Sequence, residues 1–318
     1  MKNNQYLIPC IIVGIFLIPL TLAAQEEKTK TFNGIKSIRM NTSSGIHKIQ
    51  KSTNTSVTVL LRHTYKAGIE HTIEQDGDRL IINETLTDRN ARGESSWMLT
   101  VPDDLPIRFL TGSGNIDASD IKLDLDATTG SGDLVFRKVT GHIKATTGSG
   151  DLELQGFNGD INVTIGSGNA RVENSQGNIR VNCGSGTIRV ADSKAKFRMN
   201  NGSGNVVSRN ITLDGSSQFN SGSGNAQVIL AVTPQHNLSV NSGSGAAELN
   251  FNGNEIAGEI VMRANKRTGI ISSPFPFDKE EEISGEGGQV TMKKTFMKGN
   301  SSRVIEVTTG SGEAIIKK

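Results

Sequence analysis

The sequence is short of aromatic residues, proline and cysteine, and these shortages narrow the kind of protein that it can encode. Aromatic side chains make up 4% of the 318 residues, with a single Trp, and proline occurs 7 times. Glycine, by contrast, occurs 36 times. This composition agrees with an all-β repeat protein, which needs many tight turns and few large side chains.

The sequence also lacks an excess of charge of either sign. Lys and Arg together number 34 and Asp and Glu 32, so the formal net charge is only +2. A protein that holds nucleic acid usually carries a basic stripe against the phosphate backbone. We therefore expect no nucleic acid among the partners of this protein.

Only two cysteines are present, and the first lies in an apolar N-terminal run. Cys10 is inside the run from Leu7 to Leu22, which follows Lys2 and precedes small residues. This pattern predicts a secretory signal peptide over residues 1–24, with an uncleaved membrane anchor as the alternative. Cleavage leaves Cys183 as the single thiol, so no intrachain disulfide can form and stability must come from stacking.

The dominant feature of the sequence is a repeated Gly-Ser-Gly triplet. The triplets begin at nine positions, the first six of them 18 residues apart: Gly112, Gly130, Gly148, Gly166, Gly184, Gly202, Gly222, Gly243 and Gly310. A fixed period of this length indicates a repeat architecture that grows by adding units. The segment Asn41 to Gly45 resembles a degenerate earlier copy, so the repeat extends back to about residue 32.

Apolar residues alternate with polar ones on both sides of each triplet. In the coil that starts at Gly148, Leu152 and Leu154 follow the triplet, and Ile161, Val163 and Ile165 precede the next one. Period-2 alternation indicates strands with one buried face. Two strands and two turns in 18 residues predict an all-β, parallel β-solenoid, a single-stranded β-helix whose coils stack about 4.8 Å apart.

The triplets are expected at the corners of the coils. Closing a coil in so few residues favours glycine because it tolerates positive φ, and stacked corners leave little room for side chains. The serines form a column whose hydroxyls are expected to bond the turn backbone: Ser113, Ser131, Ser149, Ser167, Ser185, Ser203, Ser223 and Ser244. Cys183 shares an inward column with Thr129 and Thr147, which predicts a buried thiol.

These patterns predict one continuous solenoid domain in several segments. We expect a signal peptide at 1–24, a flexible leader at 25–31, and irregular N-terminal coils with a cap at 32–110. Regular Gly-Ser-Gly coils follow at 111–250 and irregular C-terminal coils at 251–318. Terminal coils of a solenoid are commonly irregular because they must cover exposed strand edges.

One outward column combines carboxylates with a histidine. Asp124, His142 and Asp160 lie 18 residues apart, which places them on adjacent coils. Such a group could bind a divalent metal, while the alternative is a solvated ladder of compensating charges. Asp133 and Asp151 form a second stacked pair, but asparagines share their column, which indicates a turn-capping position. We therefore expect no resident metal or cofactor, with the first column as the only metal candidate.

The segment from Ser272 to Ser284 interrupts the last coils. Pro274 and Pro276 exclude a central strand, and Phe275 and Phe277 are apolar side chains in a segment that is otherwise polar. This pattern predicts a protruding loop or cap, in which the two phenylalanines either pack on the flank of the solenoid or form a partner surface.

The chain resembles the bacterial "putative adhesin" domain of unknown function, which is related to the head-GIN adhesin-like domains. The likeness lies in VPDDLPIRFLTGSGNI, in the serial Gly-Ser-Gly motifs and in the closing RVIEVTTGSGEAIIKK, and it covers residues 32 to 318. The resemblance implies an exported β-solenoid with no catalytic residues to assign.

The leading functional hypothesis is a non-catalytic, adhesin-like surface-binding protein of the cell envelope. Its expected ligand is a glycan or an envelope protein, and its location is the periplasm, the outer membrane surface or the medium. Two alternatives stay open at this point: a polysaccharide-active β-helix enzyme of the envelope, and an accessory partner of a membrane regulator. The sequence leaves the ligand and the oligomeric state undefined.

Overall fold

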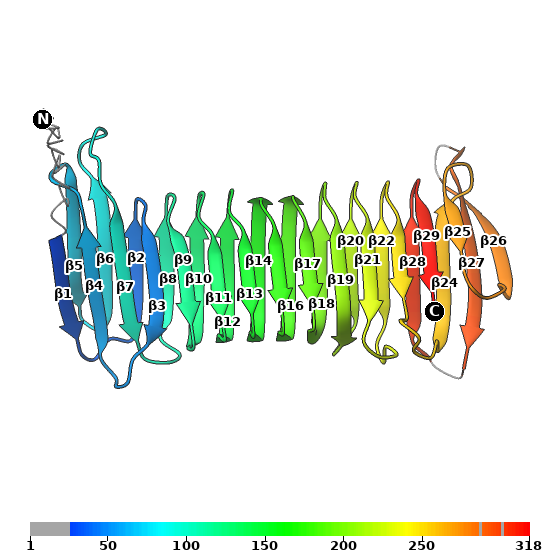
Figure 1. The fold of residues 1–318 in the computed structure, drawn as a ribbon, viewed down its shortest axis with the longest axis horizontal. Helices are drawn as coiled ribbons and strands as arrows, with labels where there is room; N and C mark the ends of the chain where they lie inside the picture. Colours follow the sequence, from blue (N-terminus) through cyan, green and yellow to red (C-terminus); the bar gives the residue numbers. More distant parts are fainter. Residues whose placement is uncertain (1–25, 286–287, 300–301) are drawn as a thin grey trace, which may run out of the picture.

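The computed structural model describes residues 26–285, 288–299 and 302–318, so the expected signal peptide lies outside the described residues. The described chain is all-β and builds a long row of stacked coils (Figure 1). No helix within the described ranges is long and apolar enough to cross a membrane. The all-β, solenoid-like prediction is confirmed.

Strands of 3 to 10 residues make up the row. The N-terminal strands are β1 Glu26–Phe32, β2 Ser37–Thr42, β3 Ile46–Lys51, β4 Val57–His63, β5 Ile69–Asp76, β6 Arg79–Leu86, β7 Ser95–Val101, β8 Pro106–Thr111 and β9 Asn115–Ser119. The regular coils contain β10 Lys122–Thr129, β11 Leu134–Arg137, β12 Thr140–Thr147, β13 Leu152–Gln155, β14 Asn158–Ser167, β15 Ala170–Glu173, β16 Gln176–Ser185, β17 Ile188–Ala191, β18 Lys194–Asn201, β19 Val206–Leu213, β20 Ser217–Ser221, β21 Ala226–Leu230, β22 Leu238–Ser242 and β23 Ala247–Asn250. The C-terminal strands are β24 Gly258–Asn265, β25 Ile270–Ser272, β26 Lys279–Ser284, β27 Val290–Lys298, β28 Val304–Thr309 and β29 Glu313–Lys317.

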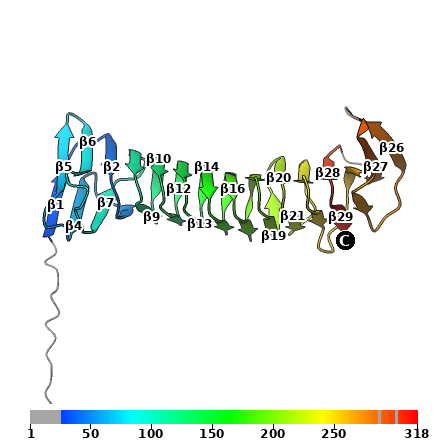
Figure 2. The same ribbon diagram turned by 90° about the horizontal axis from the view of Figure 1, so that it is seen from above.

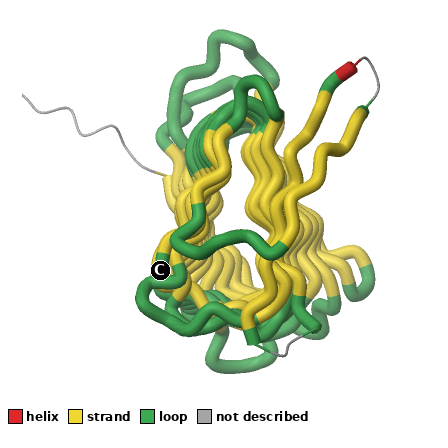
Figure 3. Tube along the Cα trace, turned by 90° about the vertical axis from the view of Figure 1, so that its right-hand side faces the viewer, coloured by secondary structure: helices red, strands yellow, loops and turns green. Residues whose placement is uncertain are grey.

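Each regular coil contributes one strand to each of two facing sheets. Sheet A contains the strands that follow the triplets, such as β11, β13 and β15, and sheet B the strands that lead into them, such as β10, β12 and β14. From β10 to β18, equivalent strands of successive coils pair in parallel without a shift of register, so that Leu125 lies beside Ile143 and Ile143 beside Ile161. Further along, the register shifts between Ser208 and Ile211 of β19. Figure 3 shows the two layers along the axis of the row.

The core is the narrow space between the two sheets. The inward columns of both sheets are buried, including Leu134, Leu152 and Val172 from sheet A and Val163 and Val181 from sheet B. Because each sheet buries one face only, alternate residues along every strand face solvent. The 18-residue period therefore sets both which residues form the core and which outward residues line up.

The triplet corners need glycine because of crowding. A Cβ on Gly148 would lie 2.4 Å from the carbonyl oxygen of Gly130, and one on Gly130 would lie 2.3 Å from that of Gly112. The expectation of positive φ is wrong for most triplet glycines; only Gly168 and Gly186 have it. Steric contact between stacked corners, rather than backbone handedness, selects glycine here.

The expected bonding of the triplet serines is also wrong. Their side chains are exposed, and it is the backbone N–H that donates to the glycine carbonyl of the preceding coil, as from Ser149 to Gly130 at 3.0 Å. The side-chain donors are instead the inward residues that precede the triplets. Thr147 Oγ1 donates to the Gly132 carbonyl at 2.9 Å, and Cys183 Sγ lies 3.2 Å from the Gly168 carbonyl.

Left-handed backbone occurs at the opposite corner of the coils. A second 18-residue column has φ between 49° and 65°, with the members Asp120, Lys138, Gly156, Asn174, Asp192 and Asn210. Asn, Asp and Gly tolerate this conformation best, which explains most of the column. Sequence analysis missed it because the column contains several residue types.

The N-terminal end of the row is interleaved. Strand β2 pairs in parallel with β6 on one side and β8 on the other, so the first coil lies inside the stack. The outermost strands, β1 and β5, pair in antiparallel fashion with β4 and β6. Residues 26–31, expected as part of a flexible leader at 25–31, instead form most of β1, since a charged sequence is well suited to an exposed sheet edge.

The C-terminal end repeats this arrangement. The last coil of the chain, β28 and β29, lies between β22 and β23 on one side and β24 and β25 on the other. The triplet at Gly310 therefore stacks directly on Gly243. Strands β26 and β27 cover the end in antiparallel fashion. The expectation of a wholly parallel solenoid fails at both ends, and the sheets are mixed.

One buried histidine joins the first coil to the regular array. His47 is 1% exposed, its Nδ1 lies 3.0 Å from the Asn115 carbonyl, and its Nε2 lies 2.9 Å from the Thr42 hydroxyl. A carbonyl only accepts, so Nδ1 carries the proton and Nε2 accepts from Thr42. Burial lowers the pKa of His47 from 6.5 to about 4.

The crowded corners generate a first prediction. Gly148→Val should destabilise the protein by at least about 2 kcal/mol, because its Cβ would overlap the Gly130 carbonyl. Ser149→Val, whose side chain faces solvent in the same triplet, should change stability far less. Denaturant unfolding of both variants measures the difference, and equal midpoints would contradict the steric account.

The pKa of His47 generates a second prediction. The folded protein resists protonation of His47 below pH 6.5 while the unfolded chain accepts it, so stability falls between pH 6.5 and about 4. The contribution is on the order of 3 kcal/mol. His47→Gln should remove this part of the pH dependence, whereas the exposed His236→Gln should keep it. Parallel profiles of ΔG of unfolding against pH for the wild type and His47→Gln would refute the assignment of this pH dependence to His47.

Candidate functional site

A large concave surface of the described chain lies on the outer face of sheet B. This groove, the sheet-B trough, has a volume of about 920 Å³ and runs over β10, β12, β14, β16, β18, β20, β22 and β28. Most of its lining residues are polar members of the outward columns, such as Asp126, Lys144 and Arg198, and inward apolar residues such as Ile143 and Phe197 lie between them. In Figure 2, β5 and β6 at one end and β26 and β27 at the other rise above the strands between them.

The predicted Asp124, His142 and Asp160 column lies at one end of the trough. The register places His142 between the two aspartates on β10, β12 and β14. His142 Nδ1 is 3.4 Å from Asp160 Oδ2, and both side chains are more than half exposed. Among the described residues, no group of three or more His, Cys, Asp and Glu side chains could hold a metal ion. The arrangement is that of a solvated charge ladder.

A second column, two residues further along the strands, follows the same pattern. Lys144 lies between Asp126 and Asn162, and its Nζ is 4.0 Å from Asp126 Oδ2. Exposed pairs of this kind contribute at most about 1 kcal/mol each. The second column therefore balances its charges, whereas the first, with two carboxylates and one histidine, keeps a net negative charge at the β10 to β14 end of the trough.

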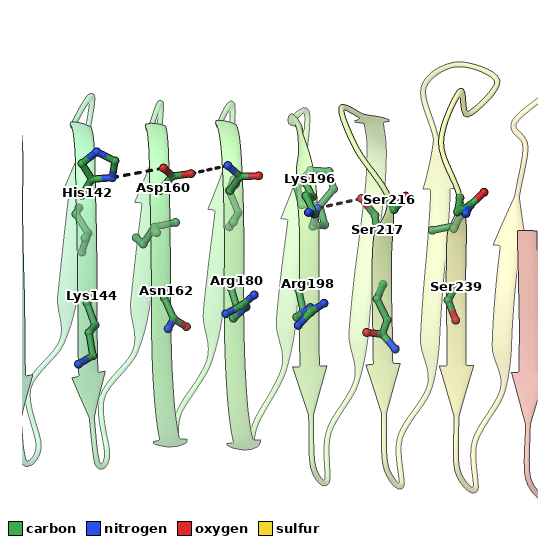
Figure 4. A pocket seen from close by; sticks show the side chains of 18 of the residues that line it. His142, Lys144, Asp160, Asn162, Arg180, Lys196, Arg198, Ser216, Ser217 and Ser239 are labelled. Carbon is green, nitrogen blue, oxygen red and sulfur yellow. Dashed lines mark hydrogen bonds and ion pairs between the residues drawn. The ribbon is translucent and has the colours of Figure 1, made fainter. Parts of the chain in front are cut away.

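The charges are not balanced further along. Arg180 on β16 lies directly beside Arg198 on β18, and Lys196 lies two residues before Arg198 on the same face (Figure 4). Ion pairs in and beside the trough involve His142, Lys144 and Arg263, and within the described residues none reaches these three exposed cations.

Sequence analysis missed this basic cluster, which consists of Arg180, Lys196 and Arg198. The signal was present, because Arg180 and Arg198 are 18 residues apart and so share an outward column. A near-zero net charge conceals such a cluster when acidic residues are placed elsewhere on the surface.

An asparagine ladder runs along the edge of the same face. Asn200 Nδ2 donates to Asn182 Oδ1 at 2.8 Å, Asn220 to Asn200 at 2.7 Å, and Asn241 to Asn220 at 2.8 Å. The two inner members, Asn200 and Asn220, each use one amide N–H and the oxygen within the ladder, which leaves a second N–H on each of these side chains. The ladder fixes these side chains in one orientation beside the basic cluster.

The stacked pair Asp133 and Asp151 has the expected turn-capping geometry. Asp133 Oδ1 accepts the backbone N–H of Asp151 at 2.9 Å, and Asp151 Oδ1 accepts that of Asn169 at 2.6 Å. Each Oδ1 therefore satisfies a backbone donor in the next coil.

Phe275 and Phe277 pack on the C-terminal end of the row. Their rings lie 5.8 and 5.9 Å from the buried ring of Phe296 on β27. The ammonium groups of Lys298 and Lys294 lie 4.8 and 5.0 Å from the two ring centroids. Both rings are half-buried, so they attach the loop to the core, and a partner surface there stays a prediction.

Cys183 is buried, as its column predicts. Its side chain is 4% exposed, and burial raises the pKa of the thiol. The thiol belongs to the inward donor column and faces away from the trough, which gives it a role in packing.

Comparison with solved structures finds several chains that match over most of their length at low identity, and three of them illustrate the likeness. They are a putative cell adhesion protein from Clostridium sporogenes (14% identity, TM-score 0.23, 92% of this chain and 99% of that one), a putative lipid binding protein from Parabacteroides distasonis (11%, 0.34, 92% and 96%) and a putative adhesin from the same species (9%, 0.33, 92% and 97%). No curated protein matches the chain.

Comparison with protein families gives a match that covers most of the regular coils. Residues 35–269 match the Toastrack DUF4097 family, a domain of unknown function. The matched range begins just before β2, whose coil stacks on the first complete triplet, and ends at the start of β25. Because the match spans more than half of the 318 residues, the chain belongs to the Toastrack DUF4097 family.

Proposed function

We propose that this protein is a non-catalytic, adhesin-like binding protein of the cell envelope, and that the sheet-B trough is its binding surface. The observation that carries the proposal is the trough itself. It is a groove of about 920 Å³ that runs over successive coils, and most of the residues that line it are polar. A groove that runs from β10 to β28 across successive coils suits an extended ligand better than a compact one.

The composition of the trough supports binding rather than turnover. General acid and base catalysis needs carboxyl groups that are free to exchange protons with a substrate. Asp160 is engaged with His142 and with the amide of Asn178, and Asp126 lies beside Lys144. The alternatives of an envelope polysaccharide-active enzyme and of a regulator's accessory partner gain no comparable support.

Export is part of the proposal and is supported by the N-terminal sequence. The apolar run from Leu7 to Leu22 after Lys2 has the pattern of a secretory signal peptide. A fold that holds its coils together without disulfides suits the periplasm, the outer membrane surface or the medium equally well.

The proposal predicts binding without product release. The purified protein should bind at least one immobilised glycan on an array that carries neutral and acidic envelope-type sugars. The same preparation, incubated with these glycans in solution, should release no shorter product detectable by chromatography. Release of product from any glycan would refute the proposed function, and so would the absence of binding to any glycan on the array.

A further inference from the structure

We propose that the basic cluster of Arg180, Lys196 and Arg198 binds the acid groups of an acidic polysaccharide that lies along the sheet-B trough. The inference rests on the proposed function, because it names the ligand class for the same surface. The ligand chemistry is a chain of sugars that carries carboxylate or sulfate groups.

The cluster places like charges on adjacent strands. Arg180 and Arg198 lie directly opposite each other on adjacent parallel strands, an arrangement that repels. The other lateral neighbours are neutral: Asn162 beside Arg180, Gln218 beside Arg198, and Asn178 beside Lys196. The fold thus holds three positive charges together that form no ion pair with a carboxylate of the described residues, and an anion would offset their repulsion.

The geometry of the cationic groups suits an acid group. Figure 4 shows Arg180 and Arg198 side by side on neighbouring strands, with Lys196 nearer the start of β18. A guanidinium group presents paired donors that match the two oxygens of a carboxylate or sulfate. Neighbouring strands lie about 4.8 Å apart, so one acid group can contact both arginines.

Neutral polar side chains lie around the cluster. Gln218 and Ser239 continue the arginine column on β20 and β22, and Asn178 and Ser216 lie beside the lysine. Amide and hydroxyl groups of this kind exchange hydrogen bonds with sugar hydroxyls. Repeated coils present these groups at a constant interval, as a polymer of repeated units requires.

Other anionic macromolecules fit the trough less well. A flat anionic membrane would contact the raised strands β5, β6, β26 and β27 before it reached the floor of the trough (Figure 2). Single-stranded nucleic acid is usually held by exposed aromatic side chains on which bases stack. The aromatic residue in this part of the trough, Phe197, is 1% exposed.

The charge along the trough also limits where the ligand lies. Asp124 and Asp126 make the β10 end acidic, which disfavours an anionic chain there. Glu306, at the opposite end, is paired with Arg263 at 2.9 Å. The acid groups of the ligand are therefore centred on β16 and β18, with neutral parts of the chain toward β20 and β22.

The experiment compares defined polymers and two double variants of the whole protein. Isothermal titration calorimetry at low and high salt measures binding of polygalacturonate, dextran sulfate and neutral dextran. Arg180→Gln/Arg198→Gln removes two charges from the trough, and Arg189→Gln/Arg209→Gln removes two exposed charges from the strands of sheet A as a control.

We expect an acidic polymer to bind the wild type and the control variant alike. The trough variant should bind it at least about tenfold more weakly, and added salt should weaken the binding further. Preference for polygalacturonate identifies a carboxylate ligand and preference for dextran sulfate a sulfate ligand. Since Arg180 and Arg198 repel each other, the trough variant should unfold at a midpoint no lower than that of the wild type.

Four results would overturn the inference. The first two are failure of both acidic polymers to bind, and binding of neutral dextran as tight as that of the acidic polymers. The third is equal affinity of the two double variants for an acidic polymer. The fourth is binding of phosphatidylglycerol vesicles or single-stranded DNA that depends on the cluster and is at least as tight as that of the polymers. Glycan binding that is insensitive to the trough variant refutes the inference alone. The proposed function fails separately, through product release or the absence of any glycan ligand on the array.

Discussion

The close approach of stacked corners governs the rest of this structure. A Cβ on the first glycine of a triplet would lie 2.3 to 2.6 Å from the carbonyl oxygen of the coil before, as at Gly130 and Gly202. This contact exists only if successive coils keep the same register. The absence of a side chain thus fixes the spacing of both sheets, and regular spacing brings outward side chains into straight columns. The trough, the charge ladders and the asparagine ladder all depend on it.

Much of the array could be predicted from the sequence because its period combines two independent signals. The triplets fix the length of a coil, and alternation of residues such as Leu152 and Leu154 fixes which face is buried. Together they determine the neighbours of every outward residue, including His142 between its aspartates. The basic cluster could have been found by the same reasoning. It was missed because only columns that combine His with Asp were considered as binding sites, and a column of like charges was not.

The ends could not be predicted in this way, because they depend on contacts between segments far apart in the chain. Nothing local in β28 indicates that it pairs with β22 on one side and β24 on the other. The charged β1 has the composition of a leader and becomes a strand only through pairing with β4. The left-handed column at Asp120 and Asn174 lacks a common residue type, since several residues tolerate that conformation.

The interleaved ends have a consequence for the order in which the protein assembles. A simple stack can add layers in the order in which the ribosome delivers them. Here a layer that is synthesised later, β28 and β29, is an inner one, enclosed between strands made earlier. The cap formed by β24 to β27 therefore lacks the strands on which it packs until β28 and β29 have been made. Only then can the C-terminal half of the protein close.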